Sequence, residues 1–271
     1  MATNVHAAVT VIDVEYQPGF LARVYQPRGS GPFPLLLDVH GGAWNMGDRL
    51  GNARLDEEIG TSGVVVAAID FRQPPVAGYP ASIADTNLGL RWLKAHASDF
   101  HGATGSLGVL GTSSGGHMAM LSALRPRDPR YAALGHIEGD ASVNYAILCW
   151  PILDPLARYE MAKQVGRTEL VTMHDAYWGN SEAMEEGNPT RILERGEPVE
   201  TPPVLILQGT NDANVTPDMA DRFATAYRQR GGQVELVKFE GMPHTFISQK
   251  PDEPASRQAT ERIIAFVKER A

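Results

Sequence analysis

The sequence holds a single cysteine, Cys149, among its 271 residues. One cysteine excludes an internal disulfide and a zinc site built from several thiolates. Cys149 stands in the apolar run at residues 145–150, a position typical of a small buried side chain. We therefore expect this residue to have a packing role only.

The chain also lacks long apolar stretches and clusters of basic residues. None of its apolar runs approaches the roughly 18 residues of a membrane helix, and residues 1–10 have neither the basic start nor the apolar segment of an export signal. The 24 Lys and Arg residues are outnumbered by 32 Asp and Glu residues, which gives a net charge of -8. We therefore expect a cytoplasmic protein that binds neither membranes nor nucleic acid, and the sequence is compatible with a homodimer.

Most of the chain alternates between short apolar runs and helical patterns. With 43% hydrophobic residues, it is long enough to bury a large core. The first two apolar runs alternate with polar residues, as an antiparallel pair does, whereas the later ones are largely apolar throughout, as in strands buried on both faces. We predict one α/β domain over residues 1–271, with helices on both faces of a mostly parallel, eight-stranded sheet. The predicted strands are residues 9–16, 21–25, 35–39, 64–69, 106–110, 143–149, 204–207 and 234–239.

Residues 151–195 interrupt this alternation. They hold no convincing strand but two or three helical segments, residues 156–165 and 168–178 among them. An insertion at this point of an open α/β sheet lies over the carboxyl ends of the strands, where ligands bind. We interpret residues 151–195 as a small helical cap.

Residues 111–116, with the sequence GTSSGG, stand between a predicted strand and a helical run at residues 117–124. The pattern Gly-x-Ser-x-Gly between a strand and a helix is typical of a sharp turn that lifts a serine hydroxyl above the sheet edge. Glycines are needed there because neighbouring backbone would collide with larger side chains. Ser113 is therefore the candidate nucleophile.

A serine hydroxyl needs a base to remove its proton, and that base needs a carboxylate to hold its tautomer. Asp212 follows the predicted strand at residues 204–207, and His244 follows the next strand, at residues 234–239. The carboxyl ends of parallel strands meet at one edge of a sheet, so the sequence predicts a triad of Ser113, Asp212 and His244.

Three other candidates have structural explanations. Asp154 and Asp218 stand at predicted helix starts, where an acidic side chain complements the helix dipole. His117 lies on the helix directly behind Ser113, where packing explains it. We expect none of the three to take part in catalysis.

Acyl transfer also needs hydrogen-bond donors for the oxyanion of the tetrahedral intermediate. Residues 40–44, with the sequence HGGAW, follow the predicted strand at residues 35–39. Small residues at this place allow backbone amides to approach a substrate closely, so we assign donors to Gly42 and Ala43, joined by the amide of Ser114. His40 is expected to brace the loop by hydrogen bonding.

Taken together, these motifs resemble the α/β-hydrolase superfamily. Within it, the chain is similar to esterases of the hormone-sensitive-lipase branch and of the feruloyl and acetyl-xylan esterase-like branch, which share a His-Gly-Gly signature. The likeness covers residues 33–250, and it departs from the usual pattern at Ala43, where the lipase-like branch has a third glycine, and at Thr112. The motifs that carry it are residues 40–44, 70–72, 79–81, 111–117, 177–179, 188–189, 209–212 and 243–246.

The resemblance implies a serine carboxylic-ester hydrolase that forms an acyl-enzyme and needs no metal or organic cofactor. Its substrate is expected to be a small-molecule ester with a small to medium acyl group. Four aromatic residues are expected to line the substrate pocket, namely Trp44, Tyr177, Trp178 and Phe246.

Two alternatives remain open at this point. The same triad serves an arylformamidase or amidase, and some relatives with a His-Gly-Gly-x-Trp loop cleave formamides. The fold also occurs in ligand-binding receptors without activity, because a fold does not determine a function. Such receptors generally lack a member of the triad, whereas this chain has all three.

Overall fold

The computed structural model describes residues 4–5, 9–135 and 137–271. Residues 1–3 and 6–8, which make up most of the stretch from which we expected no export signal, lie outside these ranges. A single sheet runs through the molecule in the order β1-β2-β3-β5-β4-β6-β7-β8-β9. All eight predicted strands are confirmed, and β1 adds a ninth of two residues. The strands are β1 (Asn4–Val5), β2 (Val9–Gln17), β3 (Phe20–Pro27), β4 (Phe33–Val39), β5 (Val65–Ile69), β6 (Gly102–Thr112), β7 (Tyr145–Cys149), β8 (Val204–Gly209) and β9 (Val234–Phe239).

The predicted change from antiparallel to parallel pairing is confirmed. β2 and β3 form a hairpin around Gly19, whose positive φ of 79° suits a tight turn, and β3 pairs with β5 in the antiparallel sense. From β5 onward, every neighbouring pair of strands is parallel. The carboxyl ends of β4, β6, β7, β8 and β9 therefore share one edge.

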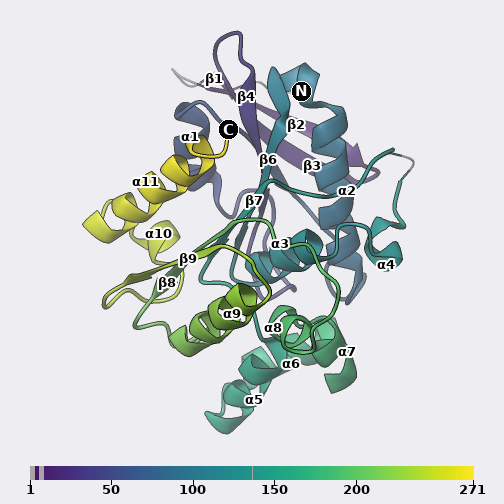
Figure 1. The fold of residues 1–271 in the computed structure, drawn as a ribbon, viewed down its shortest axis with the longest axis vertical. Helices are drawn as coiled ribbons and strands as arrows, with labels where there is room; N and C mark the ends of the chain where they lie inside the picture. The colour runs from purple at the N-terminus through teal and green to yellow at the C-terminus, as the bar shows by residue number, and fades with distance from the viewer. Residues whose placement is uncertain (1–3, 6–8, 136) are drawn as a thin grey trace.

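The central strands are apolar throughout because both of their faces are covered by helices. On β4, Leu35 and Leu37 point into one hydrophobic cluster, whereas Leu36, between them, points into the other. Figure 1 shows the two helical layers on opposite sides of the sheet. One layer contains α1 (Ala53–Thr61), α10 (Phe246–Gln249) and α11 (Pro254–Lys268), and the other contains α2 (Ala81–Ala95), α3 (Ser114–Leu124), α4 (Pro129–Ala132) and α9 (Pro217–Gln229).

Residues 151–195, called the insert below, fold into four helices between β7 and β8, more than the two or three expected. They are α5 (Pro155–Gln164), α6 (Thr168–Trp178), α7 (Ser181–Glu186) and α8 (Pro189–Glu194). Asp154 caps α5 by accepting a hydrogen bond from the amide of Ala157, so its structural explanation holds. In Figure 1 these helices gather below the sheet, and α8 contacts α9.

Cys149 has the packing position expected of it. It is a free thiol, fully buried on β7. Across the described ranges, no helix is both long enough and apolar enough to cross a lipid bilayer.

Candidate active site

Ser113 occupies a strained turn between β6 and α3. Its φ of 53° and ψ of -116° are unusual for a residue with a side chain. Two glycines make the turn possible: a Cβ on Gly111 would lie 2.3 Å from the carbonyl oxygen of Gly115, and a Cβ on Gly115 would lie 1.9 Å from that of Val39. The glycines predicted around Ser113 are therefore required by close backbone contacts on both sides of it.

His244 lies between the hydroxyl of Ser113 and the carboxylate of Asp212. Its Nε2 is 3.0 Å from Ser113 Oγ, and its Nδ1 is 2.8 Å from Asp212 Oδ2. Because a carboxylate only accepts hydrogen bonds, Nδ1 carries the proton and Nε2 is left to accept from the serine hydroxyl. The structure thus brings the three predicted residues together, although 131 residues separate His244 from Ser113.

The carboxylate of Asp212 is held from two sides. Its Oδ1 accepts hydrogen bonds from the amides of Asn214 and Val215, at 2.8 and 2.9 Å, and its Oδ2 accepts from Nε2 of Gln208 at 3.0 Å. Burial raises the pKa of Asp212, but the hydrogen bond and charge of His244, together with these amides, outweigh it and leave that pKa below its usual value. The group is therefore an ionised hydrogen-bond acceptor at neutral pH. Gln208 was not predicted as a residue of the site, although it is the last but one residue of β8, the strand that leads to Asp212.

The predicted oxyanion donors are the backbone amides of Gly42, Ala43 and Ser114. Among the described residues, none accepts a hydrogen bond from the amide of Gly42, Ala43 or Ser114. Gly42 has a φ of 114°, and a Cβ there would lie 1.9 Å from the carbonyl oxygen of Met46, so only glycine fits. Ser114 opens α3, where the first amides of a helix have no intrahelical acceptor. This set of donors is the one that the sequence predicted for an oxyanion.

His40 braces the loop that carries Gly42 and Ala43. Its Nδ1 donates a hydrogen bond to the carbonyl oxygen of Gly41 at 2.6 Å, and its ring stacks on Phe71 with 4.2 Å between the ring centroids. Burial lowers the pKa of His40, which keeps the ring neutral. The ring therefore holds the loop without adding a charge to the site.

A cavity of about 640 Å³ opens beside Ser113 and His244. The loops after β4, β6, β7, β8 and β9 form one side of it, and the insert forms the other. From the insert, the cavity is lined by Arg158, Arg167, Glu169, Leu170 and Met173. The sequence analysis identified none of these five, because a helical pattern does not show which face of an insert helix turns toward the sheet.

The four aromatic residues expected in the pocket lie elsewhere, and none of them lines this cavity. Trp44, Tyr177 and Trp178 form a buried cluster, in which the rings of Trp44 and Tyr177 stack with centroids 5.1 Å apart. Phe246 is buried against Trp150 on the other face of the sheet. Their apolar surface is used for packing, so the expectation is corrected.

Trp150 is an aromatic residue that does line the cavity. It directly follows β7 with a φ of 40°, and its ring meets that of His244 edge-on, with centroids 6.1 Å apart. The rule that selected Asp212 and His244, a position just after a parallel strand, applies equally to Trp150 and could have identified it.

His117 packs as expected and does not reach the site. Its Nδ1 accepts a hydrogen bond from Nε1 of Trp44 at 3.2 Å, and its Nε2 donates to the carbonyl oxygen of Gly187 at 2.8 Å. Burial lowers the pKa of His117 to about 4, so the ring is neutral. This histidine links the loop at residues 40–44 to the insert.

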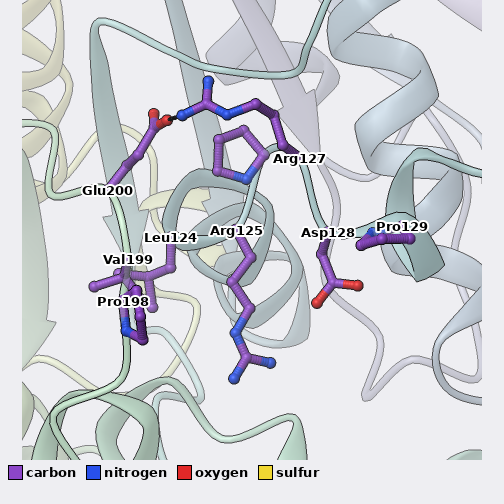
Figure 2. A pocket seen from close by; sticks show the side chains of 9 residues that line it. Leu124, Arg125, Arg127, Asp128, Pro129, Pro198, Val199 and Glu200 are labelled. Carbon is purple, nitrogen blue, oxygen red and sulfur yellow. Dashed lines mark hydrogen bonds and ion pairs between the residues drawn. The ribbon is translucent and has the colours of Figure 1, made fainter.

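A second groove, shown in Figure 2, offers no comparable chemistry. It begins at Leu124, at the far end of α3, and a helix of 11 residues spans about 16 Å from Ser114. Arg125 and Arg127 line it, but each is paired with an acid, Arg127 with Glu200 among them. Of the described residues around this groove, none is a serine, cysteine or histidine.

Throughout the described chain, no three potential metal ligands cluster.

The chain is similar to known proteins. The chain is 29% identical over 220 residues to a probable carboxylic ester hydrolase, LipM, of Mycobacterium tuberculosis, covering 80% of this chain and 49% of that protein. It is also 29% identical to Esterase LipC of the same organism, covering 79% of this chain and 53% of that protein. The chain thus spans about half the length of these curated relatives.

Solved structures show the same fold. An esterase from Pyrobaculum calidifontis superimposes with a TM-score of 0.79 at 22% identity, covering 98% of this chain and 87% of that one. An inhibited esterase B from Lactobacillus rhamnosis gives a TM-score of 0.83 at 19% identity, covering 98% of this chain and 88% of that one. The predicted α/β-hydrolase fold is therefore confirmed. The BD-FAE family model matches residues 23–227, and the chain belongs to that family.

Proposed function

We propose that the protein is a serine carboxylic-ester hydrolase. The observation that carries this proposal is the continuous line of hydrogen bonds from Ser113 Oγ through His244 to Asp212 at the edge of the cavity. The names of the relatives, a carboxylic ester hydrolase and an esterase, agree with it.

In the proposed reaction, Nε2 of His244 takes the proton of Ser113 as Oγ attacks the ester carbonyl. Asp212 holds Nδ1–H and stabilises the imidazolium that forms. The protonated His244 then gives its proton to the departing alcohol, which leaves an acyl group on Ser113. Water attacks this acyl-enzyme in the same way, with His244 again as the base, and releases the acid.

The amides of Gly42, Ala43 and Ser114 are the proposed oxyanion hole. Each lacks a partner among the described residues, so it is available to a developing negative charge without breaking another hydrogen bond. The dipole of α3, which begins at Ser114, favours the same charge. No step in this scheme needs a cofactor.

The proposed substrate is a small-molecule ester with a small to medium acyl group. A cavity of about 640 Å³, roofed by the insert, suits such a group. We also propose that the insert acts as a cap and that the protein works in the cytoplasm, as a monomer or a homodimer.

Hydrolysis of 4-nitrophenyl esters from acetate to palmitate, with a fluorophosphonate probe as a covalent label, tests the proposal. We expect turnover that declines with long acyl chains, and labelling of Ser113 found by peptide mapping. A folded protein that neither turns over nor labels would be a ligand-binding protein instead. Faster cleavage of an aryl formamide than of the matched acetyl ester would identify an amidase.

A further inference from the structure

Arg158, on α5 of the insert, is a buried cation in the wall of the catalytic cavity. Only 1% of its surface is exposed. Its Nε donates to the carbonyl oxygen of Asn214 at 3.2 Å and its Nη2 to the side-chain oxygen of the same residue. Its Nη1, however, is buried without a hydrogen-bond partner in the described chain. A buried guanidinium is costly unless its donors are satisfied, so this one calls for an explanation.

Arg91, on α2, is a buried arginine that does not line the cavity, and it serves as a comparison for Arg158. It is 4% exposed, and its Nε and Nη1 donate to Asn87 Oδ1 and to the carbonyl oxygen of Ile137, at 3.0 and 2.9 Å. Its Nη2 donates to the carbonyl oxygen of Leu134. All three nitrogens of Arg91 therefore have acceptors, although no acid is paired with it. The open Nη1 of Arg158 is therefore not a necessary result of burying an arginine in this fold, although Nε of Arg191 and of Arg270, outside the cavity, also lacks a hydrogen-bond partner among the described residues.

A second guanidinium, that of Arg167, lines the same cavity and is exposed. Its Nη1 donates to the carbonyl oxygen of Ala213 at 2.8 Å. In the ranges that the structure describes, neither Arg158 nor Arg167 forms an ion pair with a carboxylate. Asp212 is close enough to act on Arg158, but its carboxylate is engaged with His244. The insert thus lines the cavity with two cations that have no ion pair and with one carboxylate, that of Glu169, which leaves an excess of positive charge there in a protein whose net charge is -8.

Arg158 keeps its charge in spite of its burial. Burial lowers its pKa to about 10, the charge of Arg167 acts in the same direction, and Asp212 opposes them. The side chain is therefore still a cation at neutral pH, and an anion is the natural complement for its free donor. A planar guanidinium binds a carboxylate well, because several N–H groups face the same way.

We propose that Arg158, assisted by Arg167, binds a free carboxylate on the substrate, so that the preferred substrates are esters that carry a second, ionised acid group. This inference rests on the proposed hydrolase function and narrows its substrate class. Leu170 and Met173, which line the same wall, supply apolar contact for the chain that joins the ester to the carboxylate.

The competing explanation is that Arg158 only clamps the loop after β8 through Asn214, two residues beyond Asp212. A clamp affects charged and neutral esters alike, because it acts through the position of the triad. A carboxylate receptor affects the charged ester alone. The ratio of kcat/KM between a charged ester and its neutral counterpart therefore separates the two roles.

Two matched pairs of substrates place the carboxylate on either side of the ester. For the acyl side, the pair is mono-4-nitrophenyl adipate and its methyl-capped diester, and for the alcohol side it is 4-acetoxybenzoate and its methyl ester. Rates are measured for the full-length protein and for the variants Arg158→Gln and Arg167→Gln. Arg228→Gln is the control, because Arg228 is exposed on α9, away from the cavity, and its loss changes the net charge equally.

We expect the native protein to prefer the charged ester in one of the two pairs. Arg158→Gln should lower that preference about 10- to 100-fold, as expected for the loss of hydrogen bonds to a charged group. Arg167→Gln should lower it by a factor of a few, and Arg228→Gln should not change it. KM for the charged ester should rise most in Arg158→Gln.

The proposal is overturned if the native protein prefers the capped ester in both pairs, or if Arg158→Gln lowers both rates by the same factor. If circular dichroism shows that Arg158→Gln does not fold, the test uses Arg167→Gln instead, because Arg167 is exposed. An unchanged preference of that variant for the charged ester then overturns the proposal. Hydrolysis of the capped esters without any charge preference rejects this inference but keeps the hydrolase. Failure of every ester, capped ones included, rejects both.

Discussion

Gln208 donates a hydrogen bond to Oδ2 of Asp212 at 3.0 Å, the same oxygen that accepts from His244. Asp212 therefore does not depend on the histidine alone for its orientation. Gln208 is fully buried at the end of β8, so its amide is fixed by the sheet. It is a positioning residue, because it acts on the triad through Asp212.

Replacing Gln208 by Met should lower kcat about tenfold, since a hydrogen bond to a charged group is lost while the side-chain volume is kept. An ionised carboxylate that has lost this donor should also hold the proton on Nδ1 of His244 more strongly. The pH–rate profile of kcat/KM should then show its acidic limb at higher pH than in the native protein. Gln229→Met, at an exposed position on α9, is the control, and an unmoved acidic limb would contradict the assignment of Gln208.

Asp212→Asn should cost about 10⁴-fold in kcat with 4-nitrophenyl butyrate, if the effect known from serine proteases applies here. The neutral amide keeps an acceptor for the amides of Asn214 and Val215 but no longer holds the reactive tautomer of His244. The thermal midpoint should be measured in parallel, to separate catalysis from folding. A loss of only a few-fold would mean that another acid supports His244.

Ser113→Ala should abolish turnover and labelling by fluorophosphonates. The change removes one oxygen from a side chain that is not part of the core, so the free energy of unfolding should stay within about 1 kcal/mol of the native value. Activity and urea denaturation are the measurements. Ser98→Ala, at an exposed position of the 3-10 segment Ala97–Phe100, is the matched control and should keep full activity. Residual turnover in Ser113→Ala would place the nucleophile elsewhere.

Asp56 predicts a pH dependence of stability. It is fully buried on α1, and neither of its carboxyl oxygens has a partner among the described residues. Burial, and then the charge of Asp38, raises its pKa well above the ordinary value. The folded protein therefore holds this proton more tightly than the unfolded chain does. The contribution of Asp56 to the free energy of unfolding is therefore most favourable below the unfolded pKa of about 3.9. This contribution is lost as the pH rises through the folded pKa.

Asp56→Asn removes the ionisation and keeps the shape of the side chain. Its thermal midpoint should exceed that of the native protein at pH 8, and the difference should shrink toward pH 5. Differential scanning fluorimetry across this range is the measurement. Asp218→Asn, on the first turn of α9, controls for the loss of one negative charge. A difference that stays constant with pH would show that Asp56 does not titrate in this way.

The sequence predicted the eight main strands and the residues of the site that follow them, because both depend on local patterns. Ser113, Asp212 and His244 each stand directly after an apolar run, and parallel strands bring such positions to one edge. The oxyanion donors at Gly42, Ala43 and Ser114 were predicted for the same reason, and they remain a proposal. None of these predictions depends on contacts between side chains that are far apart in the sequence.

The lining of the cavity depends on contacts between side chains that are far apart in the sequence. The predicted aromatic lining was therefore wrong. Trp44 and Tyr177 are 133 positions apart in the sequence, so their stacking is invisible to any local pattern. In the sequence, Arg158 looks like an ordinary polar residue of a helix, and its contact with Asn214, 56 positions further along the chain, cannot be seen there. Side chains that face the cavity and those that face the core have the same helical spacing.

The close contact between Gly115 and the backbone of Val39 has a further consequence. The serine turn and the loop after β4 are interlocked through main-chain atoms, so neither can shift without the other. The main chain around Ser113 and the loop after β4 therefore keep a fixed spacing, while side chains of α5 and α6 line the other side of the cavity. Substitutions of the insert side chains that line the cavity can therefore change which molecules fit, while the main chain around Ser113 keeps its position. New substrate preferences can evolve in this way without a change in the reaction.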